Sequence, residues 1–240
     1  MNNTKETIKL LLKSFIYNSV PSLRECVDFK KIYALAKQQH IDGILGYVIT
    51  QHNLCEDKKV EAMFLNSYLS AITVNTNQIE KFEKLLSTLN SNNIDVIVFK
   101  GAAIRSIYPI SELRSFSDVD LVIRKNDRTT SHQLMLDLLY ECTVDYGLVY
   151  GYKKGIEYYE LHESLINEDI LHGDTLDTYF NNPWNYAIKI RDGLYEFDDN
   201  FHLLYLIAHI AKHIHFGGAG IRMYLDVALF IKEKYDKYGR

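Results

Sequence analysis

The sequence predicts an α+β protein in which a small mixed β-sheet lies between two helical regions. Apolar residues recur at helical spacing over residues 1–90 and again over about 201–234, and this spacing places them on one face of each helix. Between these regions, apolar runs at 94–99 and 118–123 have the length of short strands. We therefore expect a helical subdomain at 1–90, a sheet-bearing core at 91–170 and a helical C-terminal subdomain at 171–240.

The bulk composition is that of a globular protein of one or two domains. The chain has 240 residues, of which 47% are hydrophobic, enough for a packed core. The net charge of −4 lacks the basic surplus typical of nucleic-acid-binding proteins, although it is compatible with a local basic groove. Cys26, Cys55 and Cys142 are odd in number and far apart, which argues against a disulfide framework and a zinc ribbon. We expect reduced thiols in the cytoplasm.

The sequence also predicts no membrane association. The apolar run near the N-terminus is broken by Lys9 and Lys13 and is not followed by a small-residue cleavage site, unlike a secretory signal. No apolar stretch reaches the length of a membrane span.

The N-terminal region predicts several amphipathic helices. A first helix carries an apolar stripe of Ile8, Leu11, Leu12, Phe15 and Ile16. Asn3 and Glu6 precede this stripe with the spacing of a capping box, which marks a helix start. A second helix is expected from about Asp28 to Gln39, and a turn at His40-Ile41-Asp42-Gly43 leads into further helix through Val48. The longest periodic segment runs from about Lys58 to Asn90.

Two short strands are expected in the core. Ser91-Asn92-Asn93 ends the long helix, and Ile94 to Phe99 is a continuous apolar run of strand length. After a turn at Gly101, a short helix is expected to run to Tyr108, where Pro109 stops it. A polar loop leads to the second strand, Asp118 to Ile123, and Asn126-Asp127 marks the start of a helix that runs to about Tyr140.

A β-hairpin and two helices complete the expected elements. Residues 143–166 are rich in Tyr, Val and Leu, and Lys153-Lys154-Gly155 has the composition of the hairpin turn. In the second arm, alternation puts Tyr158, Glu160 and His162 on one face of the strand, and Glu157, Tyr159 and Glu163 on the other. Helical periodicity returns between about Phe201 and Lys234, on both sides of Gly217-Gly218.

The Asp118-Val119-Asp120 segment carries the main chemical signal. Residues i and i+2 of a strand point to the same face, so both carboxylates project together and repel each other. A divalent cation relieves this repulsion, and oxygen ligands suit Mg²⁺ or Mn²⁺. Seventeen residues before Asp118, Gly101 allows a tight strand-to-helix turn whose free backbone N–H groups offer a phosphate site.

Several of these residues together resemble a known superfamily. They are Lys100-Gly101-Ala102-Ala103, Tyr108-Pro109, Arg114 and Asp118-Val119-Asp120-Leu121. The pattern resembles the nucleotidyltransferases that share the DNA polymerase β palm, in particular a poorly characterised bacterial branch with a Lys-Gly-Ala motif. Ala102 departs from the Gly-Gly or Gly-Ser turn of the wider superfamily. The resemblance implies a third acid on a later strand, and Glu160-Leu161-His162 matches this branch, whereas the wider superfamily more often has an Asp there.

The resemblance implies a metal-dependent nucleotidyltransferase with a nucleotidyltransferase core around the small sheet. It would move a nucleoside monophosphate from a nucleoside triphosphate, which we expect to be ATP, to an acceptor and release pyrophosphate. Asp118 and Asp120 would hold Mg²⁺ or Mn²⁺, and Glu160 would join them on a second ion. Nucleotide contacts would come from Lys100, Gly101, Ala102 and Arg114. A small molecule, an RNA end and a protein side chain stay open as acceptors.

The geometric expectation is that the strands of Asp118 and Glu160 are neighbours in a sheet with helices on one face. For Lys100, a phosphate contact is favoured over an ion pair with a site carboxylate. Arg114 could clamp the triphosphate or anchor its loop to Asp118. Two further hypotheses are a non-catalytic nucleotide-binding or toxin–antitoxin-type module, and a metallohydrolase built on His209, His213 and Asp226.

Overall fold

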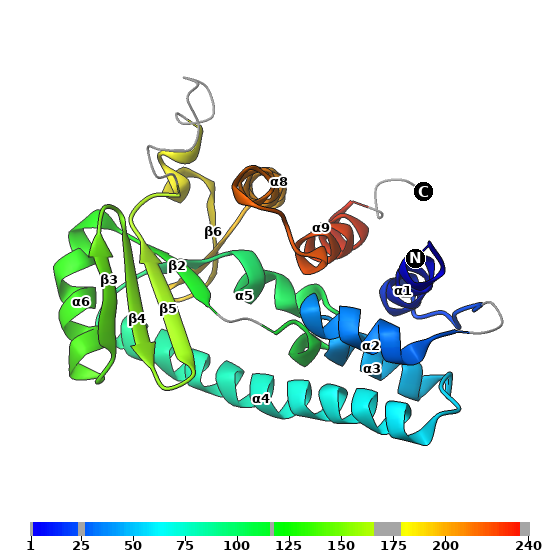
Figure 1. Ribbon diagram of the computed structural model, residues 1–240. Helices are drawn as coiled ribbons and strands as arrows, with labels where there is room; N and C mark the ends of the chain where they lie inside the picture. The colour runs from blue at the N-terminus through cyan, green and yellow to red at the C-terminus, as the bar shows by residue number, and fades with distance from the viewer. Residues whose placement is uncertain (1, 24–26, 116–117, 166–178, 236–240) are drawn as a thin grey trace. The chain divides into compact units, whose positions relative to one another are not determined.

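Seven strands form one mixed β-sheet (Figure 1). The computed structural model describes residues 2–23, 27–115, 118–165 and 179–235. The strands follow the order β3-β4-β5-β2-β1-β7-β6 across the sheet. Their bounds are β1 Val96–Val98, β2 Val119–Ile123, β3 Glu141–Tyr146, β4 Val149–Lys154, β5 Glu157–His162, β6 Ala187–Arg191 and β7 Leu194–Phe197.

Parallel pairs join strands that are distant in the sequence. β2 lies parallel to β5, and β1 lies parallel to β7, whereas β1 and β2 are antiparallel neighbours. The β3-β4-β5 strands form an antiparallel meander at one edge, and the β6–β7 hairpin forms the other edge. The β4–β5 turn falls at Gly155, which has a φ of +61°, as predicted for this hairpin.

The contacts divide the chain into two units. One comprises Met1–Asn77, Arg105–Ser115 and Ala219–Arg240, and the other comprises Gln78–Ile104 and Phe116–Gly218. The second unit holds the whole sheet. The predicted domain boundaries, three consecutive regions along the chain, remain a prediction.

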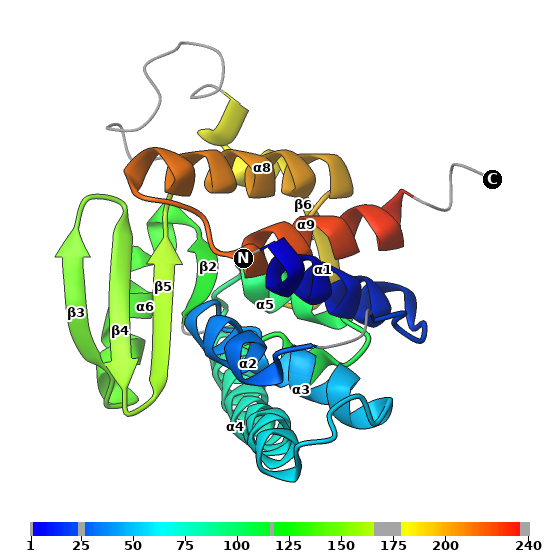
Figure 2. The same ribbon diagram turned by 45° about the vertical axis from the view of Figure 1, so that its right-hand side comes forward.

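Both faces of the sheet are covered by helices of the second unit (Figures 1 and 2). The C-terminal turns of α4 (Lys58–Ser91) and α6 (Arg128–Asp137) pack with residues such as Val119, Leu121 and Tyr159. On the opposite face, α8 (Asp199–Phe216) packs with Ile97, Phe99 and Val122. We expected helices on one face only, and α8 corrects this expectation.

The other unit is helical. It contains α1 (Asn2–Tyr17), α2 (Phe29–Gln38), α3 (Asp42–Gln51), the first part of α4, and α9 (Ile221–Lys234). Asp28 caps α2 by accepting a hydrogen bond from the Lys31 N–H at 3.0 Å. α1 begins at Asn2, so Asn3 lies inside the helix and the expected capping box is wrong; Glu6 instead pairs with Lys9 at 2.8 Å.

Most of the predicted elements are present. The long periodic segment forms α4, and the apolar runs form β1 and β2 with slightly shorter bounds than expected. After β1, the chain forms α5 (Lys100–Ile104) and a short 3₁₀ turn, Arg105–Ile107. A second 3₁₀ turn, Ser111–Leu113, lies in the expected polar loop.

The β6–β7 hairpin was not predicted, since we placed its residues in a helical C-terminal subdomain. β6 is short and mostly exposed at the sheet edge, so its sequence lacks an apolar run. An available signal was the Asp192-Gly193 dipeptide between alternating residues, which is a frequent hairpin turn.

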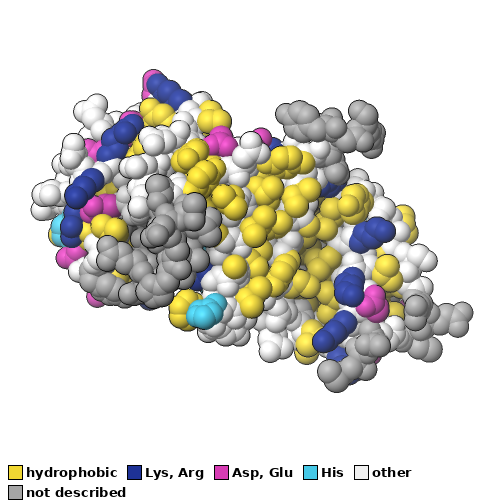
Figure 3. Space-filling view, turned by 90° about the horizontal axis from the view of Figure 1, so that it is seen from above, with side chains coloured by type: hydrophobic (Ala, Val, Ile, Leu, Met, Phe, Trp, Pro, Cys, Tyr) yellow, Lys and Arg dark blue, Asp and Glu magenta, His cyan; other side chains and the backbone are white. Residues whose placement is uncertain are grey.

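Apolar side chains are also exposed on α8. Ile207 is 49% exposed, Ile214 56% and Phe216 65%, and the surface seen from above shows many hydrophobic side chains (Figure 3). None of the helices in the described part of the chain combines the length and apolar composition needed to cross a membrane.

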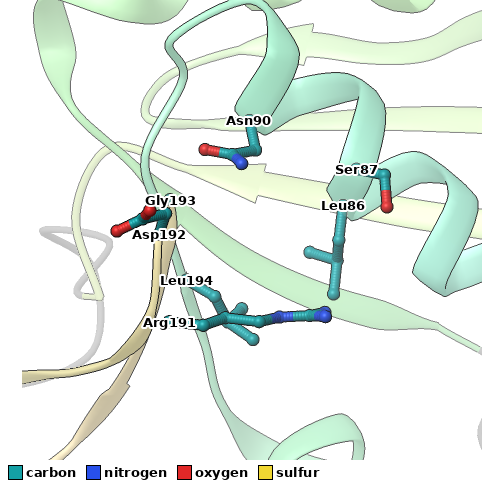
Figure 4. Close-up of a pocket in the computed structure, with 7 residues that line it drawn as sticks. All are labelled: Leu86, Ser87, Asn90, Arg191, Asp192, Gly193 and Leu194. Atoms are coloured by element: carbon teal, nitrogen blue, oxygen red, sulfur yellow. The ribbon is translucent and has the colours of Figure 1, made fainter.

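The turn between β6 and β7 packs closely on the end of α4. Asn90 of α4 and residues 191–194 line a small cavity of about 70 Å³ (Figure 4). Gly193 has a φ of +71°, and a Cβ atom there would lie 2.3 Å from Asn90 Oδ1 and 2.9 Å from Asn90 Cβ. The Gly193 carbonyl accepts a hydrogen bond from the Val96 N–H at 2.9 Å. This glycine therefore allows the turn to reach β1.

We predict that Gly193→Ala destabilises the protein more than Gly155→Ala does. Both glycines have positive φ, which costs a non-glycine residue about 1–2 kcal/mol. Gly155 has open space around its Cα, so it isolates this backbone effect. At Gly193 the contact with Asn90 Cβ adds about 1–3 kcal/mol. Chemical denaturation of the two variants would measure the difference, and equal losses would show that the contact with α4 does not constrain position 193.

Candidate active site

The candidate site lies where β2 and β5 run side by side. These strands are parallel neighbours, and their register pairs Asp120 with Glu160. This confirms the predicted adjacency of the two strands. Asp120 is 3% exposed and His162 is 7% exposed, whereas Glu160 is half-buried. The side chains of Asp120, Glu160 and His162 each offer one ligand atom, and these atoms lie within 4.8 Å of one another.

His162 belongs to this group, although the sequence argument gave it no chemical role. Its Nε2 lies 3.0 Å from Asp120 Oδ1 and 3.5 Å from Glu160 Oε2. The signal was present in the alternation of β5, because residues 160 and 162 share one face of the strand. Asp118 lies just before β2, is half-buried and is not part of the three-residue group. Its role as a metal ligand stays a prediction.

Lys100 forms a buried ion pair with Asp120. The Lys100 Nζ lies 2.6 Å from Asp120 Oδ1, and both side chains are largely shielded from solvent. Burial alone would lower the pKa of Lys100, but the charge of Asp120 outweighs it and raises this pKa. Burial likewise opposes ionisation of Asp120, yet Lys100 and His162 hold the pKa of this carboxyl well below its usual range. Of the two roles considered for Lys100, the structure therefore shows the ion pair with a site carboxylate.

The backbone at Lys100 is constrained as well. Lys100 is the first residue of α5 and has a φ of +51°, a left-handed conformation that is uncommon for a non-glycine residue. The sharp change from β1 to α5 thus occurs at Lys100, one residue before the glycine on which the sequence argument relied. Gly101 and Ala102 follow as buried residues of α5. Their backbone contact with a phosphate stays a prediction.

The α8 helix contributes an aromatic and imidazole row on the same face of the sheet. The Tyr205 ring centre lies 5.4 Å from that of Phe99, which precedes Lys100 in the chain. His209 stacks on Tyr205 at 6.0 Å, and the His213 ring lies 4.6 Å from His209. Burial, followed by the positive charges of Lys100 and His213, lowers the pKa of His209 to about 3. His209 is therefore neutral at physiological pH.

Arg114 has a different partner from those that we expected. Within the helical unit, Arg114 donates two hydrogen bonds to the Asp226 carboxylate, each 2.8 Å long. The Tyr108 hydroxyl donates to the same carboxylate at 2.6 Å. This buried, bidentate pair joins the 105–115 segment to α9. A nucleotide contact by Arg114 stays a prediction.

The same pair bears on the metallohydrolase hypothesis. Asp226 uses its carboxylate for Arg114 and Tyr108. Among the residues that the structure describes, His209 and His213 do not belong to a group of three or more ligand atoms. Asp226 belongs to the helical unit and the two histidines to the unit that holds the sheet, so the metallohydrolase stays a hypothesis.

The donor set of the site is suited to a divalent cation. Two carboxylates and one imidazole can bind such an ion through oxygen and nitrogen. The carboxylates are held by neighbouring strands, so their spacing is set by the sheet. Lys100 already compensates the charge of Asp120. The fold therefore does not need a metal ion to offset this buried charge.

This fold and site define a nucleotidyltransferase. The profile of the family described as "Uncharacterised nucleotidyltransferase" matches residues 25–238, so the chain belongs to this family. The protein is accordingly an enzyme of the transferase class, and the resemblance drawn from the Lys100–Ala103 and Asp118–Leu121 motifs is confirmed at the level of the superfamily. No functionally curated protein matches the chain.

Three solved structures are similar to the chain at low sequence identity. The solution structure of the antibiotic-resistance factor ANT(2'')-Ia is 11% identical, with a TM-score of 0.50, over 68% of this chain and 87% of that one. The crystal structure of ANT(2'')-Ia in complex with adenylyl-2''-tobramycin is 10% identical, with a TM-score of 0.48, over 68% and 92% of the two chains. A nucleotidyltransferase-like protein from Paracoccidioides brasiliensis is 19% identical, with a TM-score of 0.42, over 66% and 78%.

We predict that Lys100→Met lowers the free energy of unfolding by about 3–5 kcal/mol, because it leaves the Asp120 carboxylate buried without its cation. Lys189→Met is the matched control in the same unit, since Lys189 pairs with Asp192 at the exposed surface and such pairs contribute little. Denaturant titrations of both variants would make the comparison. Equal stabilities for Lys100→Met and the parent would contradict a structural role for the buried pair.

We also predict that the protein loses stability between about pH 6.5 and pH 3, partly through His209. The folded protein holds the pKa of His209 near 3, whereas an unfolded His titrates near 6.5. As the pH falls through this window, the unfolded state takes up a proton that the folded state refuses, so the free energy of unfolding decreases. Burial lowers the pKa of His213 as well, which adds to the same trend.

His209→Gln should reduce this pH dependence, because glutamine stays neutral. The measurement is the free energy of unfolding of parent and variant at pH 7 and pH 4.5. The same loss in both proteins would show that His209 does not carry the effect.

Proposed function

We propose that the protein transfers a nucleoside monophosphate from a nucleoside triphosphate, which we expect to be ATP, to an acceptor hydroxyl, with release of pyrophosphate. The observation that supports this most is the convergence of Asp120 and Glu160 on neighbouring parallel strands. Membership of the nucleotidyltransferase family supports the reaction class. A small molecule, an RNA end and a protein side chain remain the candidate acceptors.

Asp118, Asp120 and Glu160 are the residues that we propose to hold Mg²⁺ or Mn²⁺, and the His162 side chain lies beside Asp120 and Glu160. The donor chemistry fits through the carboxylates, because Asp120 and Glu160 present oxygen ligands within 4.8 Å of each other. When bound, such an ion would neutralise negative charge on the phosphates and lower the pKa of the acceptor hydroxyl.

The burial of the two carboxylates suggests a division of work. The side chain of Asp120 is 4% exposed, whereas that of Glu160 is 27% exposed. The acceptor arrives from solvent, so the more exposed Glu160 is better placed to serve it. Asp120 would then serve the triphosphate side of the site, where Gly101 and Ala102 are proposed to offer backbone N–H groups.

Lys100 combines the two interpretations that the sequence left open. Its ammonium neutralises Asp120 in the structure. A lysine carries its charge on a flexible stem, so Lys100 can keep Asp120 ionised before the nucleotide arrives and donate to a phosphate oxygen afterwards. Lys100 is therefore a proposed nucleotide-binding residue that also stabilises the protein before the nucleotide binds.

The test is a transfer assay with Glu160→Gln, which keeps the shape of the side chain and removes its charge. The parent is incubated with labelled ATP, magnesium and a cell extract, and the labelled product and the released pyrophosphate are measured. We expect the variant to lose about two orders of magnitude or more in rate, comparable with removing one strong electrostatic contributor. Its affinity for ATP with magnesium should change little.

Glu157→Gln is the matched control for this assay. Glu157 lies on the same strand but on the opposite face, where it pairs with Lys81 at 3.1 Å and accepts a hydrogen bond from the Tyr140 hydroxyl at 2.6 Å. Its replacement should affect stability and leave the rate per folded molecule near that of the parent. A Glu160→Gln protein that transfers at the parental rate would refute the proposed role of Glu160.

A further inference from the structure

We propose that His209, Lys212 and His213 of α8 form a subsite for the triphosphate of the nucleotide. This inference rests on the proposed function and assigns residues to it that the Asp-x-Asp and Lys-Gly-Ala motifs do not include. The three residues are called the α8 row.

The row starts beside the carboxylate site and runs toward the C-terminal end of α8. Tyr205, His209 and His213 are spaced four residues apart, which places them on one face of the helix. Ring contacts of 6.0 Å and 4.6 Å connect them in turn, and Tyr205 contacts Phe99 at 5.4 Å. Lys212 lies three residues after His209, so it shares this side of the helix.

Exposure increases along the row. Tyr205 is 8% exposed, His209 and Lys212 are half-buried, and His213 is exposed. A ligand held at Asp120 and Glu160 could therefore extend along the row toward solvent. The triphosphate of a nucleotide is an extended, flexible group of this kind.

In the described part of the chain, Lys212 forms no direct ion pair, although Glu160 and Asp120 lie close enough to affect its charge. The sequence from Phe201 to Phe216 contains no Asp or Glu. Burial, followed by repulsion from Lys100, lowers the pKa of Lys212, while Glu160 and Asp120 oppose this. A half-buried cation near a second cation is unfavourable unless an anion joins them.

The donor chemistry favours a phosphate chain as that anion. An ammonium offers three N–H donors and no acceptor, and an imidazole ring offers an N–H donor. Phosphate oxygens accept charge-assisted hydrogen bonds from such groups. The alternative ligand for two histidines four residues apart is a transition metal. In the described part of the chain, His209 and His213 lack the third ligand atom that a closed site needs.

The test measures the binding of inorganic tripolyphosphate and of ATP to the full chain by titration calorimetry, with magnesium in excess. Adenosine, which has no phosphate, is the control ligand. We expect Lys212→Ala to weaken both phosphate ligands by about tenfold or more, since charge-assisted hydrogen bonds have this magnitude. Lys212→Arg should retain most of the affinity because it keeps the charge. His213→Gln should also weaken binding, by a smaller factor.

His215→Gln is the matched control variant. His215 is exposed on the same helix, two residues after His213, so it points away from His213, and it tests whether an imidazole outside the row contributes to binding. It should bind tripolyphosphate as the parent does, and the melting temperatures of all variants verify that they fold.

Three outcomes would overturn the inference. If the parent binds ATP and the Lys212 and His213 variants bind it equally well, the α8 row is not the subsite, while the proposed function stands. If the parent binds neither ATP nor tripolyphosphate, the proposed function fails and this inference fails with it. If Zn²⁺ binds the parent but not His209→Gln, and both proteins bind tripolyphosphate with the same affinity, the row is a metal site instead.

Discussion

The fold of the core depends on keeping one buried carboxylate ionised. Asp120 is 3% exposed on a strand in the interior of the sheet, where an unpaired negative charge would be strongly unfavourable. Lys100 reaches it from the start of α5, and His162 reaches it from the neighbouring strand. These contacts connect the start of α5 and strand β5 to β2 at this point. The arrangement that brings the candidate site residues together is thus also the one that stabilises the buried charge of Asp120.

The chain uses its two types of cation differently. Arg114 holds Asp226 with two parallel hydrogen bonds inside the helical unit, and this planar arrangement has a single preferred geometry. Lys100 holds Asp120 through one ammonium on a flexible stem. An arginine suits a fixed structural contact. A lysine suits a site where the cation must change from a carboxylate partner to a phosphate partner. The residue types therefore agree with a structural role for the first pair and a functional role for the second.

Local patterns in the sequence predicted the parts of the site that depend on local geometry. The i and i+2 alternation correctly placed Glu160 on the face opposite Glu157, and the apolar runs correctly located β1 and β2. The partner of Arg114 could not be found in this way, because Arg114 and Asp226 are 112 residues apart and neither residue has a distinctive neighbourhood. The ion pair between Lys100 and Asp120 was one of two options, and the sequence alone did not indicate that the lysine is buried. The β6–β7 hairpin was not predicted because its strands are short and exposed. The Asp192-Gly193 turn was its main signal in the sequence.

The parallel pairing of β1 with β7 has a consequence for how the protein is made. β1 spans residues 96–98, and its partner residues in β7 are 194–196. On the ribosome, β1 emerges long before β7, and during that interval one edge of this strand, which ends just before Phe99 and Lys100, lacks its β7 backbone partner. Closing such a distant pair is entropically slow. The nascent core therefore remains an open sheet with an exposed edge until β7 has been synthesised, and this edge is where a chaperone would protect it from pairing with another chain.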